Sequence, residues 1–161
     1  MSRFYKVSYH QYLQDTGKED CVDTLREYGA IKLPERATRL SAGYDFFAPF
    51  AFTLQPGESI RFSTGVGIEL DSDKFLACYP RSGLGFKNKV HLWNTVGIID
   101  ADYSLSDNEG HIGVKLCNGG NVPVTIEQGT AYMQGIITQY FLADGDNACG
   151  VRNGGFGSTD E

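Results

Sequence analysis

The sequence has no long apolar run. No stretch of its 161 residues approaches the roughly 18 consecutive apolar residues that a membrane-spanning helix needs. The opening residues 1–15 also lack the apolar core of a signal peptide. We therefore expect no membrane association, and a protein that stays in the compartment where it is made.

Basic residues are scarce. The chain has 14 Lys and Arg against 20 Asp and Glu, a net charge of −6 and a pI near 5.0. No run of Lys or Arg forms the positive stripe that nucleic-acid binding needs. Polymeric nucleic acid is therefore excluded as a ligand, whereas a nucleotide, which needs only a few basic groups, stays open.

Cysteine is sparse and scattered. The four residues lie far apart and form no C-x-x-C pair, so neither a zinc site nor a redox motif is indicated. We expect buried free thiols at these positions, which are Cys21, Cys78, Cys117 and Cys149. A chain of this length buries roughly 70% of its unfolded surface, so it needs no disulfide or metal to fold as one domain.

Short β-strands account for most of what is present. From Ile60 to Leu70 apolar side chains occupy every second position, which predicts one strand with a single buried face. Further β-prone runs, with turn residues such as Gly and Asn between them, cover Phe75 to Tyr79, 112–116, 122–126 and 132–142. The pattern predicts a sandwich, jelly roll or closed barrel, with the runs at 112–116 and 122–126 joined by a loop.

Helical periodicity is rare. Residues Asp20 to Tyr28 are the one fair helix candidate of the first part, with Asp20 as the expected N-cap. The stretch from Asp144 onward is polar and Gly-rich with a lone Phe156. Such composition is typical of a mobile tail unless something holds it.

One segment, residues 80–87, has the composition of an anion site. Pro80 ends the preceding strand, and a helical turn starting at Ser82 and Gly83 would offer free backbone N–H groups, a hydroxyl and the Arg81 guanidinium to a phosphate. The alternative is a turn with a surface arginine. The sequence contains no P-loop motif.

A second segment, residues 93–103, carries acids and an amide. Asp100 follows Ile98 and Ile99, and in an apolar setting its carboxylate could orient and deprotonate a water. Asp102 faces the same way in an extended chain, so the pair could also bind a cation. Asn94 has the donor and acceptor that suit the imide edge of a pyrimidine. The alternative is an ordinary solvated turn.

A third segment, residues 152–159, places an aromatic residue among glycines. Phe156 is a flat apolar plate, preceded by Arg152 and followed by Ser158 and Thr159. Such a strip could close over a base and its phosphates. The alternative is a disordered tail.

In this order the segments resemble the trimeric dUTP pyrophosphatase (dUTPase) family of bacterial or phage type. The resemblance runs from about Ala30 to the end of the chain and rests on five motifs in order with suitable spacing. They are AGYDF at 42–46, PRSG at 80–83, GIIDADY at 97–103, GTAYMQ at 129–134 and GGFGST at 154–159.

The resemblance implies an all-β, jelly-roll-like β-barrel that forms a homotrimer with exchanged C-terminal arms. Residues 1–29 would be an N-terminal extension packed on or near the domain, 30–143 the β domain, and 144–161 a flexible arm. The implied reaction is hydrolysis of dUTP to dUMP and pyrophosphate with Mg²⁺ as cofactor. The location would be the cytoplasm, or the host cytoplasm if a phage encodes the chain.

The resemblance also implies residue roles. Asp100 would activate the water that attacks the α-phosphorus, Asp45 would lie near the metal through a water, and Tyr103 would lie under the deoxyribose. The phosphates would be held by Arg81, Ser82, Gly83 and Gln134. Uracil would be read in a hairpin by Asn94, Gly97 and the backbone of Ile98 and Ile99. The arm would close through Arg152, Phe156, Ser158 and Thr159.

The chain departs from the family pattern in three places. Residues 104–109 form an acidic insertion after Tyr103, Ala131 replaces a usual arginine, and Arg152 lies one residue closer to Gly154 than in many relatives. Two other functions stay open. The first is a dCTP deaminase of the same fold, although that activity needs a catalytic Glu where Asp100 stands. The second is a non-catalytic jelly-roll binding or coat protein.

Overall fold

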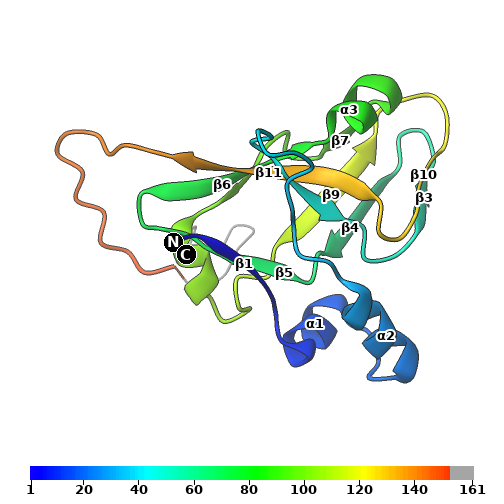
Figure 1. Cartoon of the computed structure of the whole chain (residues 1–161), viewed down its shortest axis with the longest axis horizontal. Coiled ribbons are helices and arrows are strands. Elements are labelled where there is room, and N and C mark those ends of the chain that lie inside the picture. The colour runs from blue at the N-terminus through cyan, green and yellow to red at the C-terminus, as the bar shows by residue number, and fades with distance from the viewer. Residues whose placement is uncertain (153–161) are drawn as a thin grey trace.

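Two antiparallel sheets form the body of the fold (Figure 1), which a computed structural model describes for residues 1–152. The four-stranded sheet has the order β2-β11-β6-β8, and the three-stranded sheet has the order β4-β9-β7. The first sheet consists of β2 (Tyr44–Phe47), β11 (Ala131–Gln139), β6 (Lys74–Pro80) and β8 (Gly97–Ile99). The second consists of β4 (Ser59–Ser63), β9 (Gly113–Asn118) and β7 (Val90–Leu92). Three residues with expected roles lie outside the described part of the chain, namely Phe156, Ser158 and Thr159.

Two strand pairs extend this body. They join β1 (Arg3–Lys6) to β5 (Val66–Glu69), and β3 (Phe52–Leu54) to β10 (Val124–Ile126). The helices are α1 (Tyr9–Thr16), α2 (Val22–Ala30), α3 (Ser82–Asn88) and the 3₁₀ helix η1 (Ala101–Leu105). Within residues 1–152, none of them has the length and apolar character that crossing a membrane requires.

The core lies between the sheets and the N-terminal helices. Its largest fully buried side chains come from most of the strands and from α1, and include Tyr12, Phe46, Leu76, Leu116 and Tyr132. Fully burying a large apolar side chain contributes roughly 1.5–3 kcal/mol. The β-rich architecture expected from the strand pattern is therefore confirmed.

The strand expected from Ile60 to Leu70 is in fact two strands. Gly65 has a φ of +77°, which ends β4 and lets β5 leave in another direction. Gly65 and Gly67 are buried rather than facing solvent. A Cβ at Gly65 would lie 2.3 Å from Ile31 Cδ1, and one at Gly67 would lie 2.4 Å from the Tyr5 ring. The N-terminal residues therefore cover the face that the alternation predicted to be exposed.

The runs at 112–116 and 122–126 are two strands joined by a loop, as expected, and β9 pairs with β4 and β7 whereas β10 pairs with β3. The expectation of four buried thiols needs correction. Of the four cysteines, Cys78 and Cys117 are buried, whereas Cys21 and Cys149 are exposed.

The helix expected from Asp20 is present as α2, with Cys21 rather than Asp20 at its N-cap. The sequence reading missed α1. Ser8 caps that helix by accepting a hydrogen bond from Gln11 N–H, and Gly17 ends it with a φ of +64°. The Ser-x-x-Gln spacing and the terminal glycine were the available signals.

A buried histidine joins α1 to the sheets. The His111 ring is fully buried, with Nδ1 2.6 Å from Asp15 Oδ2 and Nε2 accepting a hydrogen bond from Gly65 N–H at 2.7 Å. Burial lowers the pKa of His111 below its ordinary value of 6.5, although the Asp15 hydrogen bond and the Asp15 and Glu109 charges act in the opposite direction. The neutral ring, with its proton on Nδ1, fits both hydrogen bonds.

This burial predicts a pH dependence of stability. As the pH falls below 6.5 the unfolded chain binds a proton that folded His111 does not, so the free energy of unfolding should decrease between pH 7 and pH 5. The slope contributed by one histidine is at most about 1.4 kcal/mol per pH unit. Urea denaturation at several pH values measures it. His111→Gln should flatten the slope while His91→Gln, at an exposed histidine, should keep it. Equal slopes in both variants would contradict the prediction.

Candidate functional site

Three of the five sequence motifs, AGYDF, PRSG and GTAYMQ, meet at one end of the four-stranded sheet. The strand register places Asp45 of β2 beside Gln134 of β11, and Gln134 beside Tyr79 of β6. Arg81, directly after β6, places its Nε 3.1 Å from Asp45 Oδ1. Gln134 Nε2 donates to the carbonyl of Pro80 at 3.3 Å. We call Asp45, Arg81 and Gln134 the Arg81 cluster.

The start of α3 completes the Arg81 cluster. Arg81 is the N-cap residue, and Ser82 and Gly83 open the helix, as the sequence predicted. The first N–H groups of a helix have no partner within it and are oriented to meet an anion. The Arg81 side chain is 42% exposed while that of Asp45 is only 14% exposed, so the guanidinium is the accessible member of the pair.

Gly43 lets the Gln134 side chain pack within the Arg81 cluster. A Cβ at this position would lie 2.4 Å from Gln134 Oε1 and 3.3 Å from Gln134 Cβ. Contacts under 3.0 Å force a neighbour to move, so any side chain here displaces the Gln134 amide. The glycine of the AGYDF segment therefore leaves room for the Gln134 amide.

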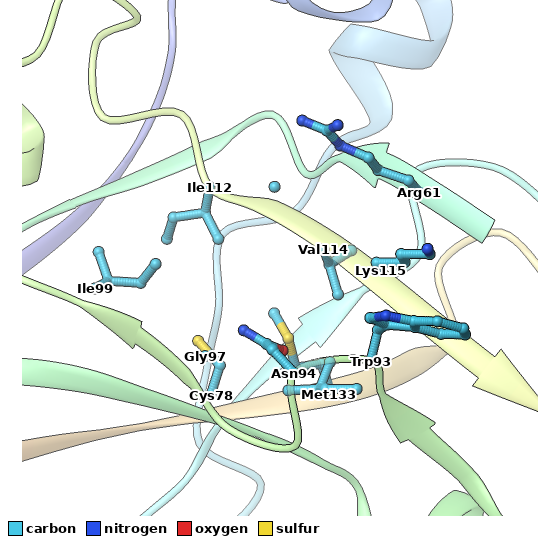
Figure 2. A pocket seen from close by; sticks show the side chains of 12 residues that line it. Arg61, Cys78, Trp93, Asn94, Gly97, Ile99, Ile112, Val114, Lys115 and Met133 are labelled. Carbon is cyan, nitrogen blue, oxygen red and sulfur yellow. The ribbon is translucent and has the colours of Figure 1, made fainter. Parts of the chain in front are cut away.

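A cavity of about 200 Å³ lies between the two sheets beside Asn94 (Figure 2). Asn94, Gly97, Ile99, Ile112 and Met133 line it, and the rim is formed by Trp93, Lys115 and Arg61. A protein cavity of roughly 150 Å³ can hold a benzene ring. The space therefore suits one six-membered ring, and we call it the Asn94 cavity.

The hairpin expected around Asn94 is an arch between two sheets. β7 pairs with β9 in the three-stranded sheet, whereas β8 pairs with β6 in the four-stranded sheet. The turn that joins them contains Thr95 with a φ of +64°. Because β8 is the edge strand of its sheet, alternate backbone groups of residues 97–99 point away from β6 and are oriented to meet a ligand.

The two isoleucines of β8 face opposite ways. Ile99 lines the Asn94 cavity, whereas Ile98 is 53% exposed and lines a second hollow. The two side chains differ because alternate residues of a strand point to opposite faces.

The second hollow has a volume of about 670 Å³ and contains both candidate acids. Asp100 is the N-cap of η1 and Asp102 lies in its first turn. Arg152 forms an ion pair with Asp100, and its Nε donates to Asp102 Oδ1 at 2.9 Å. The Asp100 side chain is 46% exposed, so in the single chain it is not in the apolar setting that the sequence predicted. We call this the Asp100 hollow.

Tyr103 directly follows Asp102, which lines the Asp100 hollow, but Tyr103 itself is only 5% exposed. Its hydroxyl donates to the carbonyl of His111 at 2.9 Å and accepts from Asn108 Nδ2 at 2.9 Å. Burial raises the pKa of this hydroxyl above its ordinary value of 10. Because the hydroxyl is engaged, a ligand would contact Tyr103 through its ring.

Within one chain the Asp100 hollow lies far from the Arg81 cluster. Leu76 pairs with Ile99, so Asp100 lies level with Phe75 near the start of β6, whereas Arg81 follows the last residue of that strand. At about 3.3 Å per residue, six residues of strand separate the two sites by roughly 20 Å. The structure therefore brings Asp45, Arg81 and Gln134 together and leaves Asp100 apart from them.

The carboxylates suit a hard cation that is bound mainly by a ligand. Among residues 1–152, no group of three or more His, Cys, Asp and Glu side chains is placed to hold a metal. Mg²⁺ usually needs only one or two protein carboxylates because water and substrate phosphates fill its other positions. Asp45, next to the start of α3, provides such a carboxylate.

Sequence reasoning missed two cations at the rim of the Asn94 cavity. Arg61 and Lys115 are direct cross-strand neighbours in β4 and β9. Lys115 Nζ lies 3.9 Å from the centroid of the Trp93 ring. The regular alternation of both strands was the available signal, since it places the two residues on one face.

The comparisons with known proteins identify the family of the chain. A family model described as dUTPase matches residues 30–159. A deoxyuridine 5'-triphosphate nucleotidohydrolase of Lactococcus lactis is 38% identical over 141 residues, which cover 86% of this chain and 94% of the relative. A protein of the same name from Hahella chejuensis is 41% identical over 138 residues, covering 80% and 87%.

Solved structures match the fold as well. The crystal structure of a dUTPase from Streptococcus mutans has a TM-score of 0.66 at 29% identity, covering 88% of this chain and 98% of that one. A Staphylococcus bacteriophage 80alpha dUTPase with dUPNHPP has a TM-score of 0.67 at 18% identity, covering 98% and 97%. At that identity the second likeness concerns the fold alone.

Proposed function

The chain belongs to the dUTPase family, and on that premise we propose that it hydrolyses dUTP to dUMP and pyrophosphate in a homotrimer. The observation that carries the proposal is the Arg81 cluster. Residues from three of the five family segments meet there around an accessible guanidinium beside a helix start. An anion as charged as a triphosphate suits this arrangement.

The base enters the Asn94 cavity in this proposal. The Asn94 amide accepts from the imide N–H of uracil and donates to the neighbouring carbonyl. An amide can turn by 180° and would then fit cytosine as well. The outward backbone groups of Gly97, Ile98 and Ile99 cannot turn, so they set the preference for uracil. Tyr103 supports the deoxyribose with its ring.

Asp100 acts as the general base. Its carboxylate takes a proton from a water whose oxygen attacks the α-phosphorus, and the bond from that phosphorus to the bridging oxygen breaks to release pyrophosphate. Arg152 must first leave Asp100, because a carboxylate paired with a guanidinium is a weaker base. The phosphates offer Arg152 a more negative partner, and its departure frees Asp100 when substrate binds.

The phosphates are held by the N–H groups and hydroxyl of Ser82 and Gly83, by Arg81 and by Gln134. When bound, Mg²⁺ would neutralise part of the triphosphate charge, and Asp45 would be the residue that holds it through water. In this arrangement Arg81 keeps Asp45 oriented, since the two side chains are 3.1 Å apart.

The separation of about 20 Å along β6 supports a site shared between subunits. A triphosphate cannot reach from the Asp100 hollow to the Arg81 cluster of the same chain. In a closed ring of identical subunits, the hollow of one chain faces the cluster of its neighbour. The homotrimer of this proposal unites Asp100 of one chain with Arg81 of its neighbour on one substrate.

The function itself is tested by product analysis. The purified protein is incubated with dUTP or dCTP and Mg²⁺, and nucleotides are separated by chromatography. We expect dUMP and pyrophosphate from dUTP and no change in dCTP. Conversion of dCTP to dUTP would favour a deaminase, and no turnover of either nucleotide would favour a binding protein.

Asp100→Asn tests the general base. The variant keeps the size of the side chain but removes the charge that accepts the proton, so kcat should fall by at least roughly 100-fold while dUTP still binds. Steady-state kinetics and equilibrium binding of dUTP measure the two effects. Asp107→Asn, in the nearby insertion, is the matched control. A near-normal kcat for Asp100→Asn would remove this residue from the mechanism.

Complementation tests the shared site. Asp100→Asn and Arg81→Ala chains are each expected to be inactive, but in mixed trimers some sites receive Asp100 from one variant and Arg81 from the other. Random mixing of equal amounts should restore about a quarter of the wild-type activity. Chains refolded separately and then combined without exchange are the control. No recovery after verified mixing would show that both residues serve the same site from one chain.

A further inference from the structure

The insertion after Tyr103 ends in an unusual turn. Glu109 and Gly110 both have left-handed backbone angles, with φ of +55° and +60°. This conformation is unfavourable for a residue with a side chain. Gly110 also has no room for one, because a Cβ would lie 2.7 Å from Ser104 Cα and 3.0 Å from the Tyr103 carbonyl oxygen. Other contacts must therefore hold the turn in place.

The N-terminal segment supplies contacts to Glu109. Ser8 donates from its backbone N–H and its hydroxyl to the two carboxylate oxygens of Glu109, each at 2.6 Å. Tyr5, in β1, donates from its hydroxyl to the Glu109 carbonyl at 2.7 Å. The two hydrogen bonds from Ser8 keep the pKa of Glu109 below its ordinary value. Three hydrogen bonds thus fix one residue of the turn.

A second connection runs through His111, two residues further on. Its buried ring bonds to Asp15 of α1 on one side and to Gly65 N–H on the other. Gln11 steadies Asp15 by donating from Nε2 to Asp15 Oδ1 at 2.9 Å. β1, the start of α1 and the end of α1 therefore all contact the turn or the residue after it.

The same turn, at residues 108–110, holds Tyr103. The Tyr103 hydroxyl bonds to the carbonyl of His111 and to the side chain of Asn108. Asn108 Oδ1 also accepts from Gly110 N–H at 3.2 Å. A continuous set of hydrogen bonds thus runs from the N-terminal segment through residues 108–111 to the hydroxyl of Tyr103.

We propose that residues 5–16 act as a brace that fixes Tyr103 through Glu109 and His111, and thereby help select deoxyribose over ribose. The proposal rests on the proposed function, in which the Tyr103 ring supports the sugar. In this role Glu109, His111 and Asp15 are positioning residues. A ring held closely under the sugar excludes an added 2′-hydroxyl, whereas a ring that shifts can admit it.

The N-terminal segment also has attachments that do not reach the turn. Arg3 forms two hydrogen bonds with Glu69 at 2.7 and 2.8 Å, which join β1 to β5. This exposed pair stabilises the same segment without touching residues 103–111. Arg3→Gln therefore separates an effect on docking of the segment from an effect on Tyr103.

The experiment compares Glu109→Ala, Glu109→Gln and Tyr103→Phe with the control Arg3→Gln. Glu109→Gln keeps the size and one acceptor oxygen, and Tyr103→Phe keeps the ring while removing its anchor. The measurement is kcat/KM for dUTP divided by kcat/KM for UTP, well below the unfolding temperature. A loss of folded protein lowers both values equally and leaves this ratio unchanged.

We expect the ratio to fall by about tenfold in Glu109→Ala and Tyr103→Phe, less than the roughly 100-fold that a 1 Å misplacement can cost. Glu109→Gln should lie between these variants and wild type, and Arg3→Gln should match wild type. Unchanged ratios in Glu109→Ala and Tyr103→Phe, or an equal fall in Arg3→Gln, would overturn the brace. A wild-type chain without dUTP hydrolysis would instead overturn the proposed function, and the sugar selection with it.

Discussion

The two-sided pairing of β6 is the constraint on which the rest of the site depends. One edge of this strand pairs with β11, which brings Gln134 and Asp45 level with its end, and the other edge pairs with β8, which delivers Asp100 to its start. The length of β6 therefore keeps the acid and the Arg81 cluster apart within one chain. Any substrate that needs both must be bound between chains.

The arginine side chains of the candidate site form ion pairs with carboxylates of this acidic protein. Arg81 lies against Asp45, and Arg152 lies against Asp100 and Asp102. Ion pairs at such partly exposed positions contribute little, typically about 0–1 kcal/mol. A triphosphate can therefore replace the carboxylates as the partner of Arg152 at small cost. The same pairs hold the guanidinium groups close to where the phosphates would bind.

The N-terminal residues connect stability to the site. Tyr5 and Ile31 cover the glycines of the β4–β5 break, and Asp15 holds the buried His111. The same segment bonds to the turn of residues 108–110, which holds Tyr103. Core packing and the geometry proposed for the sugar pocket thus depend on one set of contacts, and that set includes residues outside the segment matched by the family model.

The sequence by itself determined the β-rich class and the helical turn at Ser82, and its resemblance to the dUTPase family pointed to Asp45 and Gln134 beside Arg81. Local signals suffice for the strands and the turn, because alternation and Pro80 act over a few positions. It did not predict the break at Gly65 or the arch at Asn94, since both depend on which distant strand or side chain each residue meets. Only the tertiary structure decided that Ile98 faces outward, that Asp100 pairs with Arg152 and that Glu109 binds Ser8. The Arg152–Asp100 and Ser8–Glu109 contacts join residues 52 and 101 positions apart in the sequence. The outward face of Ile98 depends on the pairing of β8 with β6, and no local pattern encodes such pairings.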